Sequence, residues 1–279
     1  EILRCLVGSE MCIRDSNKIA RNQQKAVLPF KHFIDAGNRV MGEVVNFVIS
    51  FTPYAVLALI ARAVSKSALS DLIPLLSVLG LAYLLSIIQI FGVTSVLLKV
   101  VGKLNPLNFF KGIWPAGVVA FTSQSSIGTI PVTVRQLTKK LGVNEDVASF
   151  VASLGANLGM PGCAGIWPVL LAVFAINVLG IDYSIGQYIF LIVLAVVVSI
   201  GTVGVPGTAT ITATALFASA GLPIEIIVLL APISSIVDMA RTATNVVGAA
   251  SAAMLVARSE NELDLAVYNN CLLYTSDAA

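Results

Sequence analysis

The chain has 279 residues, of which 57% are hydrophobic and 11% charged, with a mean hydropathy of +0.91 and a formal net charge of +2. Soluble domains carry about 25% charged residues, so the composition excludes an ordinary soluble domain and predicts an integral membrane protein in contact with the lipid bilayer. We expect it to be an all-α, multi-pass protein of the cell membrane. The net charge is too small to indicate nucleic acid as a partner, and the first residues show no pattern of a signal peptide.

Both ends of the chain differ in composition from the apolar bundle between them. Residues 1–16 and about 270–279 match no helix pattern and hold three of the four cysteines. They resemble translated sequencing-adapter strings. We therefore expect residues 1–16 to be a non-native terminal segment, and residues 261–279 to be a tail that is non-native from about 270. The four scattered cysteines predict no metal site.

Two uninterrupted apolar units come first in the remaining chain. They run over about 40–64 and 72–101, broken only by Pro53 and Pro74. Each is long enough for a membrane-spanning helix. We assign residues 17–101 to these two membrane helices.

The next three apolar units are each interrupted by polar or glycine-rich sequence. The interruptions are FTSQSSIGTIP in the unit of about 112–132, GANLGMPGCAG in 146–179 and SIGTVGVPGTAT in 186–219. Broken backbone at membrane depth is tolerated only where protein or a water-filled cavity satisfies it, and interrupted segments around a midplane site are typical of secondary transporters. The alternative is that glycine and serine only permit close helix packing.

The sixth unit, about 222–257, contains charges in an apolar helix. Asp238, Arg241 and Asn245 follow one another at spacings of three and four, so a helix places them on one face. A charge at the bilayer centre costs about 2.5–3.5 kcal/mol, which makes such residues a functional-site hypothesis. A carboxylate, a guanidinium and an amide on one face can bind a zwitterion. The alternative is an ion pair that only fixes helix packing.

Positive charges gather on both sides of the third unit and are absent around the fifth. The stretches 177–188 and 219–227 contain no Lys or Arg. Because positive loops stay inside, the third unit is expected to begin and end in the cytoplasm and the fifth outside. Each would then be a re-entrant helical hairpin, and the two would approach a midplane site from opposite faces. The positive side chains are Lys99, Lys103, Lys111, Arg135, Lys139 and Lys140.

Three motifs in order, QSSIGTIPVT, SIGTVGVPG and DMARTATNVVG, resemble the C-terminal half of the dicarboxylate/amino acid:cation symporter family, which has the glutamate-transporter fold. The resemblance covers about residues 31–260. It implies glutamate-transporter-like helices with two opposed re-entrant helical hairpins, in a fragment that lacks the first four family helices, with residues 102–260 as the transport core. It also implies a homotrimer for the full-length protein.

The resemblance gives individual residues a role. Asp238 matches the residue that receives the α-amino group of the substrate, Arg241 the one that pairs with a distal carboxylate, and Asn245 the one that binds the α-carboxylate. For the two serines of the first hairpin, backbone capping is an even alternative to ligand contact. The implied substrate-binding set is Asp238, Arg241, Thr242, Asn245, Ser125, Ser126, Cys163, Val205 and Gly207, with no catalytic residue and no metal ligand.

The family's sodium sites are only partly matched. The residues from Gly159 to Gly162 stand where Asn-Met-Asp-Gly is usual, and Ala249 stands where an aspartate is expected, so oxygen ligands that hard cations need are missing. No cofactor is expected beyond a coupling ion, Na⁺ or H⁺. A second site, built mainly on backbone carbonyls, is matched by Ser199, Ile200, Thr202 and Met160, with Asn157 in place of a threonine.

The expected substrate is a small amino acid with a second negative group. Asp238 favours an amino acid over a plain dicarboxylate, and Arg241 favours a second carboxylate, which leaves aspartate, glutamate and L-cystine. The sequence GMPGCAGIWP and Gln124 resemble the L-cystine symporter branch. We therefore expect cation-coupled symport of L-cystine by alternating access, with aspartate/glutamate or dicarboxylate symport as the alternative. Trp167 is more typical of core packing than of a pocket wall.

Two other functional classes are the alternatives to a symporter. A channel-like anion conductor would dissipate a gradient, whereas a symporter accumulates substrate. An intramembrane serine hydrolase would need a base close to Ser125 or Ser126. The single histidine, His32, lies outside the apolar units, so an enzyme is not expected.

Overall fold

The computed structural model describes residues 69–202 and 207–269, together with six isolated positions before residue 55. The chain divides into two compact units, Glu1–Ala58 and Leu59–Ala279, and all named elements lie in the second unit. The helix expected over about 40–64 and the terminal segments 1–16 and 270–279 lie outside the two described ranges.

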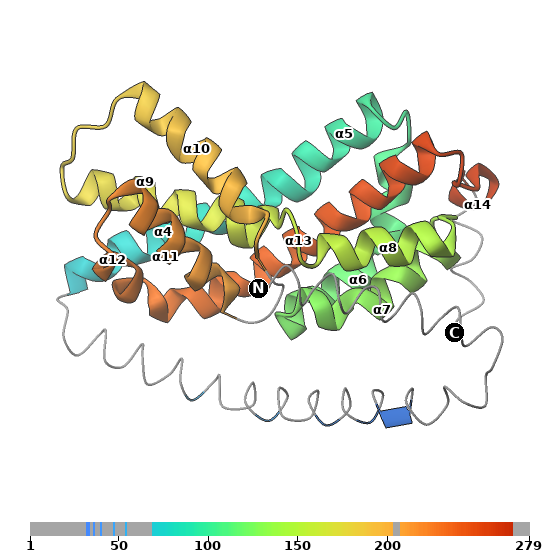
Figure 1. The fold of residues 1–279 in the computed structure, drawn as a ribbon, viewed down its shortest axis with the longest axis horizontal. Coiled ribbons are helices and arrows are strands. Elements are labelled where there is room, and N and C mark those ends of the chain that lie inside the picture. Colours follow the sequence, from blue (N-terminus) through green and yellow to red (C-terminus); the bar gives the residue numbers. More distant parts are fainter. Residues whose placement is uncertain are drawn as a thin grey trace. The chain divides into compact units, whose positions relative to one another are not determined.

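Every named element of the two described ranges is a helix, as the sequence predicted for the fold class (Figure 1). Two of these elements, η1 and η2, are short π-helices. In chain order the elements are α4 (Leu69–Ile87), η1 (Ile88–Val93), α5 (Thr94–Val100), α6 (Pro106–Ser123), α7 (Ser126–Lys139), α8 (Glu145–Gly155), η2 (Pro161–Ile166), α9 (Trp167–Val178), α10 (Ile185–Ser199), α11 (Thr208–Ala220), α12 (Glu225–Leu229), α13 (Ala231–Ser259) and α14 (Leu265–Asn269).

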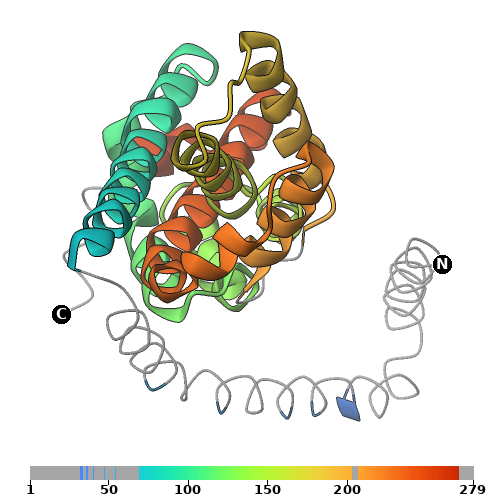
Figure 2. The ribbon, with the colours of Figure 1, turned by 90° about the vertical axis from the view of Figure 1, so that its left-hand side faces the viewer.

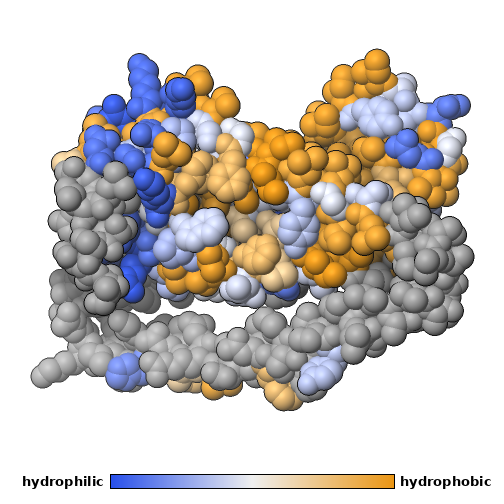
Figure 3. Space-filling model, turned by 180° about the vertical axis from the view of Figure 1, so that it is seen from behind, coloured by the Kyte–Doolittle hydropathy of each residue, from blue (hydrophilic) through white to orange (hydrophobic). Residues whose placement is uncertain are grey.

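Two helical segments of the described ranges are long and apolar enough to cross a membrane. They are Leu75–Val100, which runs through α4, η1 and α5 without a break, and Pro161–Val178, which joins η2 to α9. Large apolar side chains are exposed along α4, α5 and α10. Figure 3 shows apolar residues over much of one face of the molecule, while hydrophilic residues gather chiefly at one end.

The third apolar unit forms two helices, α6 and α7, that pack against each other. Gln124 ends α6 in a left-handed conformation, and Ser125 caps α7 by accepting a hydrogen bond from the backbone N–H of Gly128 at 3.1 Å. The pair is longer than the predicted 112–132, since the Asn105 side chain caps α6 before Pro106. The predicted unit was too short at both ends because charged residues in the outer parts of α6 and α7 lower the hydropathy there. Lys111, Arg135 and Lys139 thus lie in helices rather than in loops.

The fourth and fifth units are also broken where the sequence predicted. The chain leaves the helical path between α8 and η2, where Gly159 has φ +65°, a left-handed conformation that favours glycine. Pro161 then starts η2, a position where a helix needs no N–H. Helices α10 and α11 pack against each other and are separated by residues 200–207.

Helix α13 connects two hydrophobic cores and runs along the length of the unit in Figure 1, whereas Figure 2 shows the same helices from one end. Its first part, up to Val237, packs with α4, α9, α10 and α11 in one core. Its second part, from Val246, packs with α5, α6, α7, α8 and α14 in the other. Residues 238–245 therefore lie at the junction of the two cores, where α13 is polar and buried.

The chain after α13 folds back onto the α6–α7 pair. Val143 and Leu263 form an antiparallel β-bridge, and the buried Tyr268 donates a hydrogen bond from its hydroxyl to the Asn105 carbonyl at 2.7 Å. We call residues 260–269 the C-terminal strap. The first part of the predicted tail is thus packed against both outer ends of the α6–α7 pair.

Candidate functional site

The polar face of α13 places an ion pair inside the protein. Arg241 Nη2 lies 2.9 Å from Asp238 Oδ1, and the two residues are 2% and 7% exposed. The spacing of three on a helix makes this contact possible, as the sequence predicted. Both charges are therefore withdrawn from solvent and depend on each other and on nearby dipoles.

The Arg241 guanidinium is held at three places. Besides Asp238, its Nη2 donates to the carbonyl oxygen of Ser234 at 2.9 Å and lies 3.3 Å from the Ser234 hydroxyl. Its Cζ lies 4.4 Å from the ring centroid of Trp167, in cation–π geometry. The Nε and Nη1 nitrogens are buried and have no hydrogen-bond partner among the described residues. Two donor nitrogens are therefore available to an anionic group.

Asn245 connects the α13 face to η2. Its Oδ1 accepts a hydrogen bond from the Gly162 N–H at 2.8 Å, and its Nδ2 lies 3.1 Å from Cys163 Sγ. Cys163 Sγ is also 3.9 Å from Asp238 Oδ1. The Thr212 hydroxyl of α11 donates to the Cys163 carbonyl at 2.8 Å. We call Asp238, Arg241 and Asn245 the α13 site. The start of η2 thus lies between the α13 site and α11.

Gly162 allows this approach because it has no side chain. A Cβ at this position would overlap the backbone of Arg241. Glycine therefore permits η2 to lie directly against the helix turn that carries the guanidinium.

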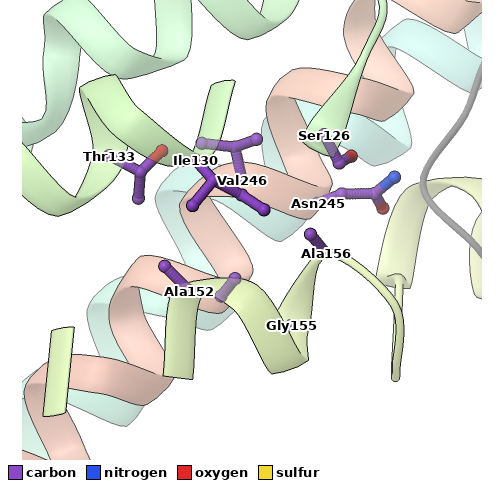
Figure 4. A pocket seen from close by; sticks show the side chains of 9 residues that line it. Ser126, Ile130, Thr133, Ala152, Gly155, Ala156, Asn245 and Val246 are labelled. Atoms are coloured by element: carbon purple, nitrogen blue, oxygen red, sulfur yellow. The ribbon is translucent and has the colours of Figure 1, made fainter. Parts of the chain in front are cut away.

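The turn between α6 and α7 reaches the same region from the other core. The side-chain nitrogen Nε2 of Gln124 lies 3.3 Å from the backbone carbonyl oxygen of Ser235 in α13. Figure 4 shows Ser126, which is buried, beside Asn245 at a small cavity of about 10 Å³, at the lower limit for one water molecule. Ser125, by contrast, uses its hydroxyl to cap α7. Of the two serines, Ser126 is the one that faces the α13 site.

This cavity contains no carboxylate among its nine lining residues. Ala249, where the family resemblance led us to expect an aspartate, is one of them, and a Cβ on the opposing Gly155 would overlap the Ala249 side chain. The remaining lining residues are Ser126, Ile130, Thr133, Ala152, Ala156, Asn245 and Val246. Such a lining offers few of the oxygen ligands that a hard cation needs.

The residues of the second expected cation site meet at the end of α10. The Ser199 carbonyl accepts hydrogen bonds from the Thr202 hydroxyl at 3.0 Å and from the Gly159 N–H at 3.1 Å. Met160 is fully buried next to this contact, whereas Ile200 is 60% exposed. The Asn157 amide donates to the Ser153 carbonyl at 2.9 Å. The structure thus brings Ser199 and Thr202 to the α8–η2 break.

The other predicted binding residues are less closely joined to the ion pair. Thr242 is buried on α13, and Gly207 is exposed at the start of α11. Val205 lies outside the described residues. Trp167 was expected in core packing and does lie in a core, but the sequence did not indicate its contact with Arg241. Ser234 was missed, although its position seven residues before Arg241 places it on the same helix face.

Comparison with known proteins gives a consistent family. The family model described as the sodium:dicarboxylate symporter family matches residues 13–259. L-cystine uptake protein TcyP of Bacillus anthracis is 35% identical over 241 residues, which cover 86% of this chain and 52% of the relative. TcyP of Bacillus licheniformis is 32% identical over 253 residues, which cover 90% of this chain and 54% of the relative. An uncharacterized symporter of Haemophilus influenzae is 39% identical over 230 residues, which cover 82% of this chain and 52% of the relative. The chain spans about half the length of these relatives.

Proposed function

The chain belongs to the sodium:dicarboxylate symporter family, and we propose that it forms the core of a secondary active transporter that imports L-cystine by cation-coupled symport. The names of the family and of the relatives describe transport and uptake, not an enzymatic reaction. The observation that carries the proposal is the buried Asp238–Arg241 pair, whose guanidinium keeps two donor nitrogens without a partner among the described residues.

The site fits a ligand that bears both charges. The ammonium group of an amino acid replaces Arg241 as the partner of Asp238, and a carboxylate replaces Asp238 as the partner of Arg241. Asn245, which has no net charge, binds the α-carboxylate through its amide. A ligand with both groups therefore compensates both members of the buried ion pair when it separates them.

L-cystine is the substrate that we favour among amino acids with a second carboxylate. A plain dicarboxylate would leave Asp238 without an ammonium partner, which is costly in a buried site. Aspartate and glutamate satisfy both charges as well. The relatives named as L-cystine uptake proteins support L-cystine for this chain.

We propose that coupling uses either Na⁺ at the end of α10 or H⁺. The cavity beside Ala249 has no carboxylate, so a cation has little to bind there. The proposed Na⁺ ligands are Ser199, Ile200, Thr202, Met160 and Asn157, of which Ser199 and Thr202 already share a hydrogen bond.

Alternating access follows from the two helix pairs in this proposal. The α6–α7 and α10–α11 pairs enter the membrane as re-entrant hairpins from opposite faces, and their turns open the α13 site to one side at a time. Ser126 and Gly207 lie at these turns. The full-length protein assembles as a homotrimer in the cell membrane.

Equilibrium binding of radiolabelled L-cystine to the purified protein tests the site. Arg241→Ala is expected to reduce affinity by at least about tenfold, because a charge-assisted contact to a buried carboxylate is lost. Arg135→Ala is the matched control, since Arg135 is an exposed arginine of α7. Equal affinity of both variants would show that the α13 site is not the binding site.

A further inference from the structure

We propose that Trp167 is a specificity-determining residue, whose indole face holds the Arg241 guanidinium in place for the distal carboxylate of the substrate. The inference rests on the proposed function of the Asp238–Arg241 site. It adds the residue that makes the site prefer a substrate with a second carboxylate to one without.

Trp167 reaches the site from a different element than the ion pair. It is the first residue of α9 and follows η2 directly, and η2 lies against α13 at Gly162. The side chain is 1% exposed, so its position is fixed by packing on all sides. The ring is therefore a rigid neighbour of the Arg241 guanidinium.

The contact between the ring and the guanidinium is strengthened by burial. The Arg241 Cζ lies 4.4 Å from the ring centroid, and Arg241 is 2% exposed. A cation over an indole face is attracted by the ring quadrupole, and the attraction is larger where water is excluded. Asp238 and Ser234 belong to the same helix as Arg241, whereas Trp167 belongs to α9. The ring thus fixes the guanidinium relative to the neighbouring helix.

An aromatic ring suits this task because its contact with the guanidinium does not occupy any of the guanidinium N–H donors. It contacts the guanidinium through its face, so Nε and Nη1 stay without a hydrogen-bond partner among the described residues. An acidic side chain in the same place would take a donor and would compete with the substrate carboxylate. Trp167 therefore orients Arg241 and leaves its donors for the substrate.

Simple core packing is the competing explanation, because Trp167 also belongs to one of the two hydrophobic cores. The two explanations differ in what they predict for a ring of the same shape with a weaker π face. Fluorine on the indole withdraws electron density from the ring face and changes its volume little. Packing would be kept, whereas the hold on the guanidinium would weaken.

The chain allows this experiment at a single site. It has two tryptophans, and the other, Trp114 on α6, is 63% exposed. In a Trp114→Phe background, tryptophans with increasing fluorination are incorporated at position 167. Dissociation constants are measured for L-cystine and for the mixed disulfide of L-cysteine and cysteamine, which lacks one carboxylate. Trp167→Phe and Trp167→Leu are measured in the same way, as an aromatic and a non-aromatic replacement.

We expect the dissociation constant of L-cystine to rise stepwise with fluorination, to about tenfold, while that of the mixed disulfide changes less than about twofold. Trp167→Phe keeps part of the preference for L-cystine and Trp167→Leu loses it. Parallel changes for both ligands, or no change for either, would overturn the role of Trp167. If the unsubstituted protein binds neither ligand, the proposed function itself fails.

Discussion

Burying the charge of Asp238 or Arg241 alone would cost much free energy, whereas burying the two as an ion pair costs less. Each carries a charge that burial penalises, and each lies within hydrogen-bond distance of the other. The guanidinium gains support from the Ser234 carbonyl and from the Trp167 ring. The pair thus holds two charges in the protein interior, and in the proposed function a ligand with the opposite charges replaces the internal contact.

A double-mutant cycle measures how strongly the two residues depend on each other. Asp238→Asn and Arg241→Met should each destabilise the protein by about 3–5 kcal/mol, because each leaves one buried charge without its partner. The double variant should lose less than the sum of the two single losses. Unfolding in mixed micelles gives the free energies, and additive losses would show that the pair is not coupled.

Gly162 permits the contact between η2 and α13, so its replacement should disturb the site. Gly162→Ala is expected to destabilise the protein by about 1–3 kcal/mol and to weaken L-cystine binding, because the added methyl group overlaps the Arg241 backbone. Gly165→Ala is the matched control in the same element, since nothing lies within 4 Å of a Cβ there. Unfolding free energies and dissociation constants are compared. Similar values for both alanine variants would contradict the close approach.

Helix breaks could be predicted from the sequence because they follow from local chemistry. Gly159 adopts a left-handed conformation and Pro161 starts a new element, as glycine and proline do in general. The ion pair also followed from its spacing of three on one helix. These features depend on residues that are close together in the chain.

Features that depend on distant residues could not be predicted in the same way. The contact of Trp167 with Arg241 joins residues of two helices and needs the packing of η2 on α13. The ends of the α6–α7 pair were missed because hydropathy ignores a capping side chain such as that of Asn105.

The C-terminal strap ties both outer ends of the α6–α7 pair. Tyr268→Phe is expected to destabilise the protein by about 1 kcal/mol, since it removes the hydrogen bond to the Asn105 carbonyl. Tyr188→Phe serves as the comparison. Tyr188 packs edge-to-face on Tyr183 in another part of the unit, and the substitution keeps the aromatic ring that makes this contact. Tyr188→Phe is expected to lower the free energy of unfolding by less than about 0.5 kcal/mol, which distinguishes it from Tyr268→Phe. A Tyr268→Phe variant as stable as the parent would show that the strap contributes little.

The two hydrophobic cores explain why the site lies where it does. Helix α13 passes from one core to the other, and its buried polar residues occupy the junction. The α6–α7 turn reaches this junction from one core, and η2 reaches it from the other. In the proposed function, movement of these turns opens the site to one side at a time, as alternating access requires.

Uptake of radiolabelled L-cystine into proteoliposomes, with the sodium and pH gradients set separately, tests the central claim most directly. We predict saturable uptake against the L-cystine gradient that needs at least one of the two ion gradients and that is lost in Arg241→Ala but kept in Arg135→Ala. Equal uptake in the absence of both ion gradients, or undiminished uptake by Arg241→Ala, would contradict a cation-coupled symporter with its substrate site at Asp238 and Arg241.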